Sequence, residues 1–278
     1  MPIFKQVDVF TNVKYKGNAV AVLFDADDLT TEEMQAIARW TNLSETTFVV
    51  RATKPEADYR VRIFTPGCEL PFAGHPTLGT AYALLEEGRI VADGGKLIQE
   101  CDAGLVEISV SGDVLSFQLP YFRMIDVGSD VVKQVEMSLG RKVVGVPVLV
   151  DDGPKWAIFE FESGDDVLGV NLDMTELSRI SEVNGWTGLG LFGPKGENEY
   201  EMRNIAPVIG VPEDPACGSG AGAVGAYLGT RGKQRRFSIS QGCCIGRDAR
   251  LTVDLSKRDN ELVVKVGGQA ITCFKGEY

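Results

Sequence analysis

Two carboxyl groups that break an internal repeat of this chain are its first candidates for chemistry. Glu45 corresponds to Gly188, 143 residues later, and Asp214 corresponds to Leu70, 144 residues earlier. A repeated scaffold needs its structural residues twice, whereas a reacting group is needed once. A pair of acids can move a proton at carbon or cleave a glycosidic bond. The alternative interpretation is an exposed turn acid at Glu45 and a capping or turn acid at Asp214.

Two predicted helix starts could bind an anion. One helix opens with Gly74-His75 and the other with Gly218-Ser219. Pro76 suits a first helical position and Ser219 is a favoured N-cap, so backbone N–H groups and the positive end of each helix dipole would face outward. Facing each other across a cleft, the two starts would hold a small carboxylate. The dipole also favours neutral His75, which could donate a hydrogen bond. Alternatively, Ser219 only caps, and the two glycines only allow close packing.

Cys217 directly precedes the second of these helix starts. A thiol there could have a lowered pKa and act as a base. The residue 144 positions earlier is Ala73, so the sequence lacks the two thiols of a two-thiol racemase. We favour a small buried residue at Cys217, with a two-base epimerase that uses Glu45 and Cys217 on opposite substrate faces as the alternative.

These residues lie in a chain that repeats itself. Residues 30–33, 58–66 and 69–84 match residues 173–176, 199–207 and 213–228, in order and at nearly one offset. The first match is a capping box, the second a strand, and the third a helix so rich in Gly and Ala on every face that it fits only inside a sheet. Helices are predicted at 75–85, 129–139 and 219–228, and first-half strands at 3–9, 19–24, 47–51, 59–64, 96–101, 105–110 and 114–119.

The repeat predicts an α+β fold of two pseudo-symmetric halves, residues 1–119 and 120–278. Each half would be a curled antiparallel sheet wrapped round one central small-residue helix. We expect the halves to meet about a pseudo-twofold axis, with the active site in the cleft between them.

Composition narrows the possible partners. The 28 Lys and Arg against 39 Asp and Glu give a net charge of −11 and a pI near 4.7, which disfavours nucleic acid and anionic membranes as partners. No apolar stretch approaches the roughly 18 residues of a membrane helix, and no apolar signal core opens the chain, so we expect a cytoplasmic protein. The six cysteines form no C-x-x-C pair and there is one histidine, which predicts reduced thiols and no zinc site. A Ser-His-Asp triad would have to use His75.

The runs GNAVAVLF, TNLSETTFVV, FTPGCELPFAGHPT, APVIGVPEDPACGSGAG and ISQGCCIGR together resemble the PhzF-like, phenazine-biosynthesis-type isomerase family. The resemblance runs from end to end of the chain and is closest to the uncharacterised, housekeeping-type members. It implies the diaminopimelate-epimerase fold, a homodimer, and an isomerase without metal or coenzyme. In it, Glu45 would shuttle a proton between carbons of a small unsaturated or amino carboxylic acid.

The residues matching His75, Asp214, Gly218 and Ser219 line the substrate cleft of that family. The chain departs from the family pattern at Ala19, where the usual G-N-P reads Gly-Asn-Ala, at Cys217, usually Thr, and at residues 246–249, where G-R-P-S reads GRDA. The departures leave the substrate's identity open.

The sequence therefore predicts a cofactor-free isomerase of a small anionic metabolite. Its catalytic residues are expected to be Glu45, Asp214 and His75, and its substrate-binding residues Asn18, Gly74, Gly218 and Ser219. A non-catalytic metabolite-binding protein is the alternative from another class, although binding alone would not require both unmatched acids.

Overall fold

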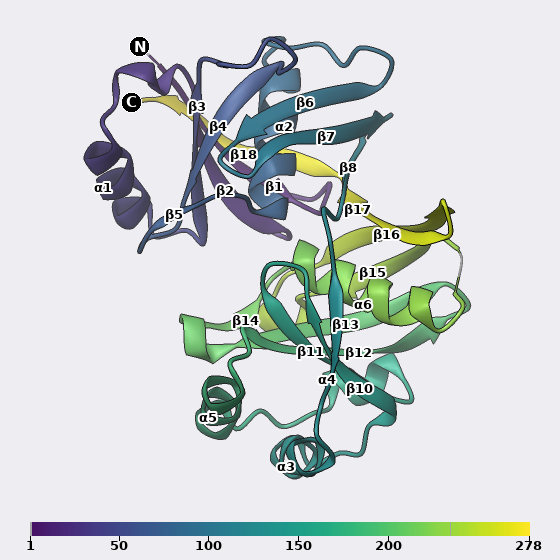
Figure 1. The fold of residues 1–278 in the computed structure, drawn as a ribbon. Helices are drawn as coiled ribbons and strands as arrows, with labels where there is room; N and C mark the ends of the chain where they lie inside the picture. The colour runs from purple at the N-terminus through teal and green to yellow at the C-terminus, as the bar shows by residue number, and fades with distance from the viewer. Residues whose placement is uncertain (1, 234) are drawn as a thin grey trace. The chain divides into compact units, whose positions relative to one another are not determined.

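The computed structural model describes residues 2–233 and 235–278, and the chain divides into two compact units (Figure 1). Unit 1 runs to Phe117 and includes Gly267–Tyr278, whereas unit 2 is the continuous segment Gln118–Val266. The units differ from the predicted halves because the last strand, β18 (Ala270–Glu277), pairs antiparallel with β1 (Ile3–Val9). Met1 and Gln234, which the predicted halves include, lie outside the described residues.

Unit 1 is one mixed sheet with helices on both faces. Its strands follow the order β18-β1-β2-β3-β4-β6-β7-β8, with the short β5 on β4. The remaining elements are β2 (Asn18–Leu23), η1 (Ala26–Asp28), α1 (Thr31–Thr41), β3 (Glu45–Val50), β4 (Tyr59–Phe64), β5 (Glu69–Leu70), α2 (Gly74–Glu86), β6 (Lys96–Cys101), β7 (Gly104–Ser111) and β8 (Val114–Gln118).

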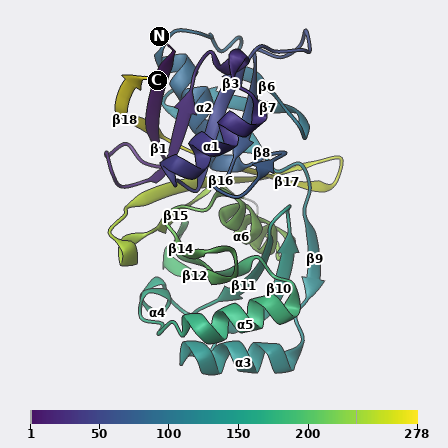
Figure 2. The ribbon, with the colours of Figure 1, turned by 90° about the vertical axis from the view of Figure 1, so that its left-hand side faces the viewer.

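Unit 2 repeats this arrangement with the strand order β9-β10-β11-β12-β13-β15-β16 and the short β14 on β13. Its helices α3 and α5 lie side by side (Figure 2). The elements are β9 (Arg123–Asp126), α3 (Ser129–Leu139), β10 (Val144–Asp151), β11 (Lys155–Glu160), α4 (Gly164–Leu168), α5 (Met174–Asn184), β12 (Gly188–Gly196), β13 (Glu199–Ala206), η2 (Pro207–Ile209), β14 (Val211–Asp214), α6 (Gly218–Thr230), β15 (Phe237–Gln241), η3 (Cys243–Ile245), β16 (Ala249–Arg258) and β17 (Glu261–Gly268).

The α+β class and the repeat of sheet and central helix are confirmed, but the sheets are not wholly antiparallel. In unit 1, β2 runs parallel to β3 and β4 runs parallel to β6. In unit 2, β11 with β12 and β13 with β15 are the corresponding parallel pairs. The reason is that each of these connections contains a helix, and a helical crossover returns the chain in the same direction.

The central helices α2 and α6 are buried because small side chains let strands approach their backbones. Nine of the residues of α2 and eleven of those of α6 are buried. Successive side chains of β2 point to opposite faces of the sheet. Val20 faces α2, whereas Ala21 and Leu23 pack with Met34 of α1 on the other face. Within residues 2–233 and 235–278, no helix combines the length and apolar character that crossing a membrane requires.

We expect Gly79→Ala, in the middle of α2, to destabilise the protein by about 1–3 kcal/mol. An added Cβ would lie 2.4 Å from Val20 Cγ1 and 2.9 Å from Val9 Cγ2, two fully buried side chains. In an open helix the same change would be stabilising by about 1 kcal/mol. Urea unfolding measures whether the free energy of unfolding falls or rises. Gly67→Ala is the control, because an added Cβ there would lie 3.8 Å from its nearest neighbour, Thr65 Oγ1. Stabilisation by Gly79→Ala would refute the close packing.

Candidate active-site groups

In unit 1 the carboxyl group of Glu45 lies against the imidazole of His75. Glu45 is the first residue of β3 and His75 the second of α2, and Glu45 Oε2 is 3.4 Å from His75 Nε2. Both side chains are largely buried. Burial raises the pKa of Glu45 to about 7, against the opposing effect of a hydrogen bond from Ser44. Both protonation states of Glu45 are therefore populated near neutral pH, as a group that takes up and returns a proton requires.

Neighbouring residues restrict the space around this pair. Ser44 Oγ, next to Glu45, lies 3.4 Å from Oδ1 of the buried Asn18. Gly74 has no room for a side chain, because an added Cβ would lie 2.6 Å from Phe117 Cζ. The structure thus brings the predicted residues Asn18, Glu45, Gly74 and His75 together in unit 1.

At the start of α6, Cys217 is the N-cap, and the prediction that Ser219 caps the helix is wrong. Cys217 has an extended backbone (φ −103°, ψ 104°), and its Sγ accepts a hydrogen bond of 3.2 Å from the Gly220 N–H. Ser219 is instead the second helical residue, and its Oγ accepts from Trp156 Nε1 at 2.9 Å. Helix α2 also begins earlier than expected, so Pro76 is its third residue, where a missing N–H is still harmless.

Cys217 is the small buried residue that we favoured, and the alternative of a lowered pKa is wrong. Burial, followed by the negative charge of Asp214, raises the pKa of Cys217 well above its ordinary value. Hydrogen bonds from Ser219 and the Gly220 N–H act in the opposite direction but are weaker. The thiol is therefore neutral at physiological pH and is a poor base.

Asp214 and Gln241 together fix the turn that leads into α6. Asp214 Oδ1 accepts a hydrogen bond from the Ala216 N–H at 2.9 Å, as expected of a turn acid. The buried Gln241 donates from Nε2 to the Asp214 carbonyl at 2.8 Å and accepts at Oε1 from the Cys217 N–H at 2.9 Å. Sequence reasoning assigned Gln241 no role, although it lies within the run ISQGCCIGR.

The structure explains why Glu45 has no counterpart in unit 2. Glu45 pairs with Val20 across parallel strands, and Gly188 pairs with Trp156 in the equivalent place. An added Cβ at Gly188 would lie 2.3 Å from the Ile205 carbonyl oxygen and 2.9 Å from Trp156 Cζ3. Unit 2 therefore has no space for a carboxylate at this position.

A repeated ion pair holds the strand that leads into each central helix. Arg62 of β4 forms two hydrogen bonds of 2.7 Å with Glu69 of β5. Arg203 of β13 forms hydrogen bonds of 3.0 and 2.8 Å with Glu213 of β14. Because such forked pairs fix geometry as well as charge, their role here is structural.

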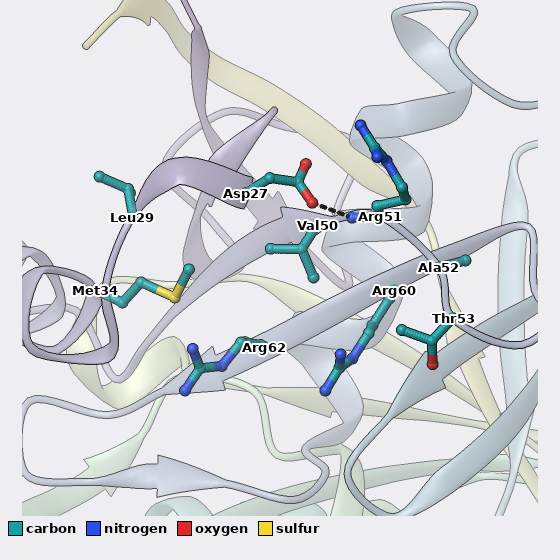
Figure 3. Close-up of a pocket in the computed structure, with 9 residues that line it drawn as sticks. All are labelled: Asp27, Leu29, Met34, Val50, Arg51, Ala52, Thr53, Arg60 and Arg62. Carbon is teal, nitrogen blue, oxygen red and sulfur yellow. Dashed lines mark hydrogen bonds between the residues drawn. The ribbon is translucent and has the colours of Figure 1, made fainter.

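A hollow in unit 1 lies at the far end of β3 from Glu45 (Figure 3). It is lined by Asp27, Leu29, Met34, Val50, Arg51, Ala52, Thr53, Arg60 and Arg62. Arg62 is paired with Glu69, and Arg60 lies within 3.9 Å of Glu100 and 3.7 Å of Asp102. The guanidinium of Arg51 is turned away from those of Arg60 and Arg62 (Figure 3). These cations are therefore not assembled as an anion site.

Comparison with known proteins decides the family. Residues 7–276 match the family described as phenazine biosynthesis-like protein. The chain belongs to this family. The resemblance predicted from the motifs is thus confirmed for nearly the whole length of the sequence.

Relatives of this phenazine biosynthesis-like chain match it from end to end. It is 47% identical over 289 residues to Antisense-enhancing sequence 1 of Schizosaccharomyces pombe, covering 99% of this chain and 97% of that protein. It is 34% identical over 282 residues to trans-2,3-dihydro-3-hydroxyanthranilate isomerase of Pseudomonas fluorescens, and the match covers 97% of this chain and 96% of that protein. The crystal structure of a PhzF-family phenazine biosynthesis protein of Bacillus anthracis superposes with a TM-score of 0.88 at 26% identity, covering 100% of this chain and 98% of that one.

The raised pKa of Glu45 predicts how replacing it alters stability. Its native pKa of about 7 exceeds the ordinary 4.5, so the native state holds this proton more tightly than the unfolded state does. Stability from this source is complete below about pH 4.5 and is lost as the pH rises through about 7. The free energy of unfolding of Glu45→Gln, measured relative to that of the wild type, should therefore increase by about 3 kcal/mol as the pH rises from about 4.5 to about 8. Urea titrations across that range test this, with Glu107→Gln on the surface of β7 as control. A pH-independent difference would contradict it.

Proposed function

We propose that this protein is an isomerase that moves a proton between two carbons of a small carboxylic acid without a metal or coenzyme. The Glu45 carboxyl group, with its pKa of about 7, buried 3.4 Å from His75, carries the proposal. Relatives named as isomerases support it. The homodimer and the cytoplasmic location stay predictions.

The proposed reaction needs one group that is first a base and then an acid. The Glu45 carboxylate takes a proton from one substrate carbon, and the electron pair left behind moves into the conjugated carboxyl system. The protonated Glu45 then returns the proton to another carbon, so no net oxidation occurs. His75 orients the Glu45 carboxyl group and can relay its proton.

Helix-start N–H groups are suited to the charge that develops on the substrate. We propose that Gly74 and His75 of α2 and Gly218 and Ser219 of α6 serve one substrate, whose carboxylate they bind. Asp214 contributes by fixing the turn before α6 through the Ala216 N–H.

We expect Glu45→Gln to slow proton transfer by about 10²–10⁴-fold, because the amide keeps the shape of the side chain and cannot carry the proton. The assay follows incorporation of solvent deuterium by NMR. Its first substrate is trans-2,3-dihydro-3-hydroxyanthranilate, the compound in the relative's name, followed by a panel of small unsaturated and amino acids.

The surface variant Glu107→Gln is the matched control and should incorporate deuterium at the wild-type rate. If a folded Glu45→Gln protein incorporated deuterium at the wild-type rate, the proposed function would be wrong.

Cys217→Thr separates one-carboxylate chemistry from a two-base epimerase. In our proposal Thr retains most activity, because its hydroxyl can replace Sγ as acceptor for the Gly220 N–H and is a favoured N-cap. In an epimerase the thiol must protonate the substrate face opposite Glu45, and a hydroxyl is too weak an acid for that step. A loss of about 100-fold or more in a variant that still folds and binds substrate would favour the epimerase.

A further inference from the structure

A buried carboxyl group outside the predicted site is without hydrogen-bond partners. Asp152 lies in the hairpin between β10 and β11 and is 7% exposed. In the described part of the chain, no other residue donates a hydrogen bond to Oδ1 or Oδ2. The backbone N–H of Asp152 itself donates to the Pro154 carbonyl and has less effect on the pKa of the carboxyl group than burial has. The adjacent Asp151 shows the contrast, because its carboxylate pairs with Arg123 at 3.2 Å.

The hairpin that carries Asp152 reaches the start of α6. Trp156, four residues further along, donates to Ser219 of the first helical turn. The negative charge of Asp152 also acts on Cys217, the N-cap, and together with Asp214 raises the Cys217 pKa. Asp152 thus belongs to the same group of side chains as the helix start to which we assign the substrate carboxylate.

Two carboxyl groups, those of Asp214 and Asp152, act on Cys217. Burial, with the nearby charge of Asp151, raises the pKa of Asp152 well above its ordinary value, and the cation Arg123 pairs with Asp151. Asp214 has a backbone partner in the Ala216 N–H. Leaving a buried carboxyl group without a donor is unfavourable, so a donor supplied by a ligand would satisfy it.

We propose that Asp152 is a specificity-determining residue that accepts a hydrogen bond from an amino or hydroxyl group carried by the substrate beside its carboxylate. The inference rests on the proposed function for the placement of that carboxylate at Gly218 and Ser219. It narrows the substrates to acids that carry an N–H or O–H donor next to the carboxyl group.

Three unreactive probes of one shape separate the possibilities: anthranilate carries an amino group, salicylate a hydroxyl group, and benzoate neither. Calorimetry measures their dissociation constants for the wild type, Asp152→Asn, Asp152→Ala and the neighbouring control Asp151→Ala. We expect the wild type to prefer anthranilate, salicylate or both over benzoate by about tenfold or more. Asp152→Ala should abolish that preference, and Asp152→Asn, which keeps one acceptor oxygen, should retain part of it. Benzoate binding should change less than about twofold in every variant.

The binding measurement does not depend on turnover, so it stays informative whether or not Glu45→Gln abolishes deuterium exchange. If Asp152→Ala weakened the binding of all three probes equally, Asp152 would be a structural residue and the proposal would be overturned. A wild type without preference for the donor-bearing probes, or without binding of any probe, would also overturn it. If Asp152→Ala fails to fold, the comparison between the wild type and Asp152→Asn decides.

Discussion

The close approach of a helix backbone to the strands around it is the constraint on which both units depend. Gly79 of α2 lies against Val9 and Val20, and Gly225 of α6 lies against Val253 and Val264. With no side chain to give way, neither helix can slide or rotate without a clash. The first turn of each helix is therefore fixed by packing further along it, which is the rigidity that our proposed carboxylate site requires.

The two units use this shared scaffold unequally. At the start of β3 the chain buries the carboxyl group of Glu45, whereas at the start of β12 the Ile205 carbonyl oxygen and the indole of Trp156 leave room only for Gly188. Burying an ionisable group opposes folding, but it brings the pKa into the range that proton transfer needs. In our proposal, unit 1 thus loses stability at one position in exchange for reactivity, whereas unit 2 has no space for a side chain at the same position.

Much of the secondary structure, and the position of Glu45, could be predicted from the sequence because these features depend on residues close together in the chain or on the internal repeat. Helix α3 spans the predicted residues 129–139, and the predicted first-half strands end within two residues of those observed. Both hydrogen bonds of the capping box at Thr30 are present. Position matching also identified Glu45 as unmatched, and the structure gives the steric reason.

The errors arose where an answer depends on contacts distant in sequence. Cys217 as N-cap was missed because sulfur is a weak acceptor and Ser219 a better one by type. The alternative of a lowered Cys217 pKa failed because burial sets the direction of the shift, and no local pattern reports burial. Gln241 acts on a turn 24 residues or more away, and Asp152 stands out only because its oxygens lack partners. The parallel strand pairs could have been inferred from the intervening helices.

The pairing of β18 with β1 has a consequence for synthesis on the ribosome. Unit 2 is continuous in sequence, so all of its strands come from one uninterrupted segment. Unit 1 begins first but is completed only after unit 2 has been synthesised, because β1 obtains its outer neighbour only when β18 emerges. Until then one side of β1 is an open edge able to pair with another strand, so aggregation during translation is a hazard of the N-terminal unit in particular.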